Sequence, residues 1–152
     1  METKTCTHCK IEKPISEFYT SKRDKFRSHC KSCSKSIAAQ RYINEPHKLW
    51  VNGTLGSHIR RGFIVTITRD QLVEMAINST HCPICGCELK WEKHKGMTAN
   101  SPTLDRIHNE HELRTDNVWI VCNQCNAMKG ETTMRELIDK CKKIVELNDA
   151  SF

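Results

Sequence analysis

Cysteine pairs are the residues of this chain best suited to chemistry. The 152 residues include ten cysteines, and eight of them form four Cys-x-x-Cys pairs. Each pair presents two thiolates from one tight turn, and two pairs complete a tetrahedral metal site. The spacing predicts two four-cysteine sites, one made of Cys6, Cys9, Cys30 and Cys33 and the other of Cys82, Cys85, Cys122 and Cys125. Because neither site leaves a coordination position open, we expect two structural Zn²⁺ ions.

Disulfides are the competing use of these thiols. The chain opens Met-Glu-Thr-Lys, and its longest apolar run is Val118 to Cys122, so neither a secretory signal nor a membrane span is expected. We therefore expect a cytoplasmic protein with reduced thiols. Of the two remaining cysteines, Cys141 shares a helical face with Leu137 and Ile144 and is expected to be buried, and Cys87 is an alternative zinc ligand.

Positive charge is concentrated in the first half of the chain. Residues 1–69 carry 14 Lys and Arg against 5 Asp and Glu, whereas residues 70–152 carry 10 against 13. This asymmetry indicates an arm for a polyanion such as DNA, with a solvated basic surface as the alternative. The nucleic-acid contacts are expected from Lys22, Arg23, Lys25, Arg27, Lys31, Lys35, Arg41, Arg60, Arg61 and Lys129.

The elements that position these residues are short. Hydrophobic residues make up 38% of the chain, a thin supply for a core, so the zinc sites are expected to add stability. Phe18 and Phe26 are expected to pack against the first site. The sequence predicts a helix over 34–43, followed by a flexible hinge at Gly53 and Gly56. The predicted parts are a zinc arm over 1–36, a basic helical linker over 37–67 and a second domain over 68–152.

The second domain reads as a small, zinc-stabilised α+β unit. Capping boxes at Thr68–Gln71 and Thr133–Glu136 predict two helices, the first with an apolar stripe of Leu72, Val73, Ala76 and Ile77. Between the cysteine pairs, 103–108 and 116–121 are rich in β-forming residues and predict a hairpin. A short helix over 126–130 would complete a ββα unit.

The motifs of this domain resemble those of a known enzyme family. Cys82-Pro-Ile-Cys85-Gly86, Asp105, Asn117 and the Cys122–Gly130 segment resemble the HNH (His-Me finger, ββα-metal) endonucleases, especially the zinc-containing branch that includes phage recombination endonuclease VII. The resemblance covers residues 68–130. The first 36 residues look like the zinc-ribbon-like or treble-clef-like arm of phage-type members. The resemblance implies a hydrolase that cleaves DNA phosphodiester bonds, in the host cytoplasm if phage-encoded.

The resemblance also implies roles for individual residues. Asp105 and Asn126 would hold one catalytic Mg²⁺ or Mn²⁺, and Asn117 would brace the hairpin loop. Arg106 stands where the family has its general-base His, and a guanidinium cannot accept a proton near neutral pH. Arg106 would instead bind the scissile phosphate, and His108 would replace the base because strand alternation places it on the same face.

Several alternatives stay open at this point. His111 is a second candidate base, Asp105 could pair with Arg106, and Asn126 could cap a helix. The Arg at position 106 also favours a non-catalytic protein that binds DNA or serves a recombination or packaging machine. A homodimer and a phage DNA-processing partner are both compatible with the resemblance.

Overall fold

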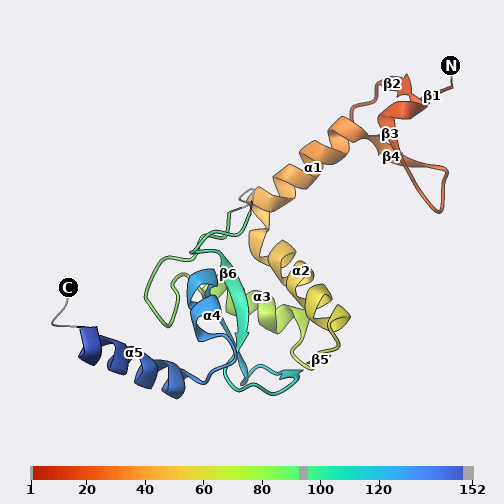
Figure 1. Ribbon diagram of the computed structural model, residues 1–152. Helices are drawn as coiled ribbons and strands as arrows, with labels where there is room; N and C mark the ends of the chain where they lie inside the picture. The colour runs from red at the N-terminus through yellow and green to blue at the C-terminus, as the bar shows by residue number, and fades with distance from the viewer. Residues whose placement is uncertain (1, 93–95, 149–152) are drawn as a thin grey trace. The chain divides into compact units, whose positions relative to one another are not determined.

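Two compact units make up the chain, Met1–Glu45 and Pro46–Phe152. The computed structural model describes residues 2–92 and 96–148, and Figure 1 traces the chain from red at the N-terminus to blue at the C-terminus. The boundary lies inside the segment 37–67, the expected linker, and each unit holds one of the predicted cysteine groups. No helix within the described ranges is long and apolar enough to span a bilayer.

The first unit consists of two small antiparallel ladders and a helix. β1 (Thr3–Thr5) pairs with β2 (Glu12–Pro14), a 3-10 turn (Ile15–Glu17) follows, β3 (Phe18–Thr20) pairs with β4 (Phe26–Cys30), and α1 spans Lys31–Asn44. Phe18 is buried against Cys6 and Cys30, and Phe26 packs on the same cluster, as predicted. So small an apolar cluster cannot stabilise a unit of this size without the metal site.

α2 (Pro46–Arg60) overturns the predicted hinge. It runs without a break through Gly53 and Gly56, so the hinge prediction is wrong. The physical reason is tertiary packing, because Val51 of this helix is completely buried in the core of the second unit. Burial on one face outweighs the low helix propensity of two glycines, which costs about 1 kcal/mol each.

A ββα unit forms the centre of the second unit. β6 (Pro102–Arg106) and β8 (Val118–Cys122) pair antiparallel over five residues, and α4 (Asn123–Lys129) follows β8 directly. The predicted hairpin and helix are therefore present. A second, parallel pair joins β5 (Ile64–Val65) to β7 (Glu112–Leu113).

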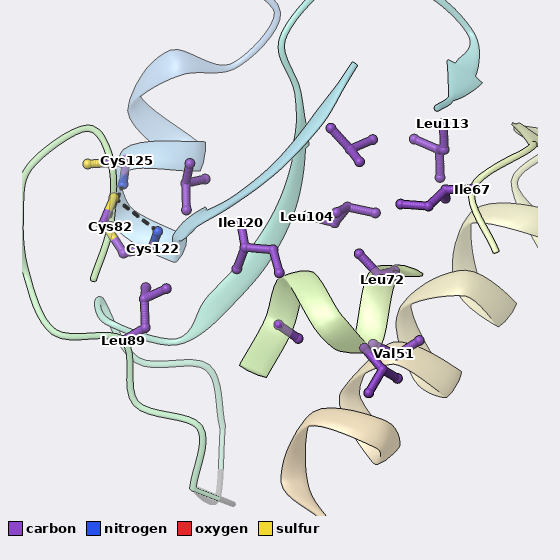
Figure 2. Close-up of a cluster of buried hydrophobic side chains, with 14 residues drawn as sticks. Val51, Ile67, Leu72, Cys82, Leu89, Leu104, Leu113, Ile120, Cys122 and Cys125 are labelled. Carbon is purple, nitrogen blue, oxygen red and sulfur yellow. Dashed lines mark hydrogen bonds between the residues drawn. The ribbon is translucent and has the colours of Figure 1, made fainter. Parts of the chain in front are cut away.

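α3 (Arg69–Asn78) provides the apolar surface on which the hairpin packs. Its predicted capping box is present: Gln71 N–H donates to Thr68 Oγ1 at 3.2 Å, and Thr68 N–H donates to Gln71 Oε1 at 2.9 Å. Figure 2 shows Leu72 of this helix near Leu104 of β6 and Ile120 of β8 in one buried cluster. Ile77, however, is 56% exposed, so its place in the predicted stripe is wrong.

α5 (Met134–Asn148) differs from its prediction in what it buries. The expected capping box forms, with Glu136 N–H donating to Thr133 Oγ1 at 3.2 Å and Thr133 N–H to Glu136 Oε2 at 2.7 Å. Leu137 is buried, but Cys141 is exposed, so the prediction of a buried thiol is wrong. The reason is that later apolar residues on this helix, including Ile144 at 52% exposure, find no covering partner within the described residues.

Candidate functional site

Both predicted cysteine groups are assembled. In each group the four sulfur atoms lie within 4.8 Å of one another, a donor set that fits one structural Zn²⁺. The first pair of each group lies in a turn, and the second pair lies at a helix start, where Cys30 caps α1 and Cys122 caps α4. Within residues 2–92 and 96–148, no other set of three or more His, Cys, Asp or Glu side chains gathers this closely.

The turns that contain the first cysteine pair of each group share the same hydrogen bond and a positive φ. Lys10 N–H donates to the Cys6 carbonyl at 2.9 Å, and Gly86 N–H donates to the Cys82 carbonyl at 2.8 Å. Lys10 has φ of 60° and Gly86 has φ of 73°. Gly86 supplies the turn as expected, and Lys10 adopts a conformation that non-glycine residues rarely take. The four cysteine side chains that meet beside this turn hold Lys10 in its strained conformation.

Backbone N–H groups stabilise the thiolate forms. Cys30 N–H donates to Cys6 Sγ at 3.2 Å, and Cys122 N–H donates to Cys82 Sγ at 3.3 Å. Burial raises the pKa of Cys6, but backbone hydrogen bonds outweigh this effect and lower the pKa to about 6. The backbone of Cys87 is the main cause that lowers the pKa of Cys85 to about 6. Within the same groups the hydrogen bond with Cys30 raises the pKa of Cys33 to about 12, and burial raises the pKa of Cys125, so Cys6 and Cys85 are the thiols that lose their protons most readily.

Cys87 does not belong to the second group of four. Burial, followed by the neighbouring Cys85, raises the pKa of the Cys87 thiol to about 12. Its carbonyl accepts a hydrogen bond from Cys82 N–H at 2.8 Å, so its role in the turn is carried by the backbone. Cys85, not Cys87, is one of the four residues whose sulfur atoms lie within 4.8 Å of one another, so the structure favours Cys85 as the zinc ligand.

Asn117 closes the loop between β6 and β8. The side chain is fully buried. Its Oδ1 accepts from His108 N–H at 2.8 Å, and its Nδ2 lies 3.2 Å from the His108 carbonyl and 3.3 Å from the Glu112 carbonyl, to which it donates. Three backbone groups are satisfied by one amide, so the predicted bracing contact is present.

Asp105 lies in a closed polar pocket. Its side chain is 8% exposed and that of Lys129 is fully buried, and Lys129 Nζ lies 3.1 Å from Asp105 Oδ2 and 3.3 Å from Oδ1. Trp119 Nε1–H donates to Oδ2 at 2.6 Å, and Lys129 also donates to the Arg106 carbonyl at 3.0 Å. Asp105 therefore pairs with Lys129, not with Arg106, which answers the alternative left open by the sequence.

This arrangement does not fit Mg²⁺ or Mn²⁺ at Asp105. A divalent cation needs a carboxylate oxygen free to coordinate it, along with open positions for water. Both oxygens of Asp105 are already engaged, and the ammonium of Lys129 would repel a second cation at the same place. The structure also corrects Lys129, which was expected to contact nucleic acid and is instead buried.

Arg106 projects to the opposite side of β6, as strand alternation requires for neighbours. Its guanidinium lies 5.0 Å from the centre of the Phe63 ring and donates to the Glu110 carbonyl at 3.0 Å. His58 and His111 also contact this ring, with centroid distances of 5.3 and 4.3 Å. The structure therefore brings Arg106 together with two histidines and separates its side chain from the Asp105 pocket.

His108 and Asn126 take positions that the sequence did not anticipate. β6 ends at Arg106, so the alternation expected to align His108 with Arg106 does not continue, and His108 is exposed in the loop. Asn126 lies in the interior of α4, whose N-cap is Cys122, so the alternative that Asn126 caps the helix is wrong. The Asn126 side chain is half-buried and makes no hydrogen bond to another described residue.

The remaining basic residues lie on open surfaces. Lys22, Arg23 and Lys25 lie in the β3–β4 turn, Arg27 on β4, Lys31, Lys35 and Arg41 on α1, Arg60 at the end of α2 and Arg61 just after it. The Arg27 guanidinium and the Lys31 ammonium each lie 5.8 Å from the Tyr19 ring centre. All of these cations are exposed except Lys31, which is half-buried, and their contact with nucleic acid stays a prediction.

Sequence reasoning missed two features of this region. Neither His58 nor Phe63 was among the candidate site residues. The signal was present in the His-x-x-Arg-Gly-Phe spacing of 58–63, which turns the chain back on itself: Phe63 N–H donates to the His58 carbonyl at 3.1 Å.

Comparisons of the chain with protein-family models, with curated proteins and with solved structures give no match.

Proposed function

We propose that this protein is a DNA endonuclease of the HNH type that hydrolyses phosphodiester bonds. The observation that carries this proposal is the β6–β8–α4 unit, in which the second zinc group holds the helix and Asn117 braces the loop. The proposal depends on this geometry together with the spacing of the motif residues. A hairpin and helix clamped in this way form a rigid frame for groups that act on phosphate.

The first unit has the features of a DNA-binding arm. Its cysteine pairs lie in a turn and at the start of α1, an arrangement that favours the treble-clef-like alternative over a zinc ribbon. α1 and the β3–β4 turn carry the exposed cations, and the cations near Tyr19 suit contacts to phosphate and sugar. In this proposal the arm supplies affinity and the second unit supplies chemistry.

A second candidate function is supported by the Asp105–Lys129 pair. A carboxylate that is buried and paired in this way acts as a structural element. If the pair persists when DNA binds, the second unit is a non-catalytic DNA-binding or accessory module of a recombination or packaging machine. The nuclease proposal requires the opposite behaviour, with Asp105 released from Lys129 in the active form.

Cleavage of supercoiled plasmid and of branched DNA in Mg²⁺ or Mn²⁺ tests the proposal. We expect nicking by the wild-type protein and its loss in Asn126→Ala. Asn126 is the better position to test, because its side chain has no hydrogen bond within the described residues. Asp105→Ala, in contrast, would leave Lys129 buried without its ion-pair partner. Gln124→Ala, at an exposed position on the same helix, is the matched control.

The results separate the two candidates. Metal-dependent nicking that is lost in Asn126→Ala and kept in Gln124→Ala supports the nuclease. Salt-dependent DNA binding without nicking in either metal supports the non-catalytic module. Full activity of Asn126→Ala would show that the catalytic assignment is wrong.

A further inference from the structure

Four side chains with basic groups surround the ring of Phe63. The guanidinium carbons of Arg61 and Arg106 lie 5.3 and 5.0 Å from the ring centre, and the rings of His58 and His111 lie edge-on to it. These residues, called here the Phe63 cluster, come from the end of α2, the turn that follows it, β6 and the β6–β7 loop. One half-buried aromatic ring thus holds together groups that are distant in the sequence.

The arginines of the Phe63 cluster differ from the nearby Arg114 in their ion pairing. Within the described residues neither Arg61 nor Arg106 forms an ion pair, and the one side-chain hydrogen bond of Arg106 goes to a backbone carbonyl. Nearby carboxylates instead form ion pairs with Arg114. Its Nη1 lies 2.5 Å from Glu110 Oε2 and 3.5 Å from Glu112 Oε2, and its Nε lies 3.1 Å from Asp116 Oδ1. These three carboxylates share one arginine, and none of them forms an ion pair with Arg61 or Arg106 within the described residues.

His58 adds a group whose charge can change. Its Nδ1 lies 2.9 Å from the Thr54 carbonyl and therefore carries the proton in the neutral ring, which leaves Nε2 without one. Burial is the largest cause that lowers the pKa of His58; the hydrogen bond with the Thr54 carbonyl opposes it, and Arg61 and Arg106 each lower the pKa by a smaller amount. An anion placed among these cations would reverse their effect and favour the imidazolium.

We propose that the Phe63 cluster is a binding site for a phosphodiester group of nucleic acid, with Arg61 and Arg106 as its charged donors and His58 as a third donor when protonated. Guanidinium groups match phosphate geometry with paired N–H bonds, and their contact with the ring fixes their planes. The site lies on the face of β6 opposite the Asp105 pocket. The choice of DNA as the nucleic acid rests on the proposed function, but binding at this site does not require cleavage.

Binding of a short fluorescent DNA duplex, measured by anisotropy over a range of salt, tests the proposal on the full-length protein. We expect Arg106→Gln and Arg61→Gln each to weaken binding about fivefold to tenfold and to reduce the salt slope by about 1. Arg135→Gln is the matched control, since Arg135 is exposed on α5 and forms no ion pair within the described residues. Arg61 is exposed, so its variant keeps the test valid if Arg106→Gln folds poorly.

The histidine gives an independent readout by nuclear magnetic resonance. We expect saturating duplex to raise the pKa observed for the His58 ring, and binding to strengthen as the pH falls from 8 to 6 in the wild type but less in His58→Gln. The facing groups are Arg61, Arg106 and His111, so His111→Gln is examined in parallel.

Two outcomes would overturn the proposal. One is equal affinity of Arg61→Gln, Arg106→Gln and Arg135→Gln together with an unmoved His58 resonance. The other is a His58 shift with inorganic phosphate alone and none with duplex, which would assign the site to free phosphate. Absence of nicking with normal cluster-dependent binding would reject the proposed endonuclease and leave this site standing.

Discussion

Replacing Lys129 with Met should strongly destabilise the second unit. The side chain is fully buried, and its ammonium contacts both oxygens of Asp105 and the carbonyl of Arg106. Met has a similar length, so the substitution removes the charge and the hydrogen bonds with little change in volume. It leaves the Asp105 carboxylate buried, with Trp119 as its remaining partner.

The expected magnitude follows from that uncompensated charge. Removing one member of a buried ion pair costs about 3–5 kcal/mol, whereas replacing both members by neutral groups is close to neutral. The double variant Asp105→Asn/Lys129→Met keeps an acceptor for Trp119 and carries no buried charge. It should therefore recover at least about 1 kcal/mol relative to Lys129→Met. Lys140→Met, at an exposed position on α5, should change stability by less than about 0.5 kcal/mol.

Urea unfolding of the zinc-loaded protein, followed by circular dichroism and tryptophan fluorescence, measures these differences. The reasoning fails if Lys129→Met costs less than about 1 kcal/mol, or if the double variant is as unstable as the sum of the two single variants. Either result would mean that the pair opens readily in solution. That finding would also favour the nuclease proposal, because Asp105 would then be free to act.

Three further predictions follow from the fold. Gly53→Ala should stabilise the protein by about 0.5–1 kcal/mol in thermal unfolding, because Gly53 lies inside α2 with open space at its Cβ position; Gly62→Ala, at φ of +85°, should destabilise it. Asn117→Ala should cost at least about 2 kcal/mol in urea unfolding, because three backbone groups lose their partner. Cys30→Ser should lower the zinc content from two ions per chain to one and unfold the first unit while the dispersed amide resonances of the second unit persist.

Local patterns in the sequence predicted α1, α3, the β6–β8 hairpin, α4 and α5, but not the strands β1–β4, the parallel pair of β5 with β7 or the unbroken helix α2. The cysteine spacing predicted both groups of four, and the capping boxes at Thr68 and Thr133 predicted two helix starts. The Asn117 brace followed from the resemblance. These features depend on residues within a few positions of one another or on a motif with fixed spacing, so the chain elsewhere has little influence on them.

The errors share a physical cause, which is packing between distant segments. Gly53 was predicted to be part of a hinge, but Val51 of the same helix is buried in the core. Cys141 was predicted to be buried, but no described residue covers its face of α5. Lys129 reads as a DNA contact because lysines are rarely buried. Only the three-dimensional pairing of α4 with β6 brings its ammonium to Asp105.

The neighbouring residues Asp105 and Arg106 lie on opposite faces of one strand and have different partners. Alternation along β6 places the carboxylate toward α4, where Lys129 neutralises it, and the guanidinium toward Phe63, where no carboxylate of a described residue pairs with it. A charge that is satisfied inside the protein has little left to offer a ligand, whereas an unsatisfied, ordered charge at the surface gains most from one. In the phosphate site that we propose, Arg106 is one of the residues that bind phosphate. Asp105 can contribute to chemistry only after its pair with Lys129 has opened, so the order of these two events is what separates a nuclease from a binding module.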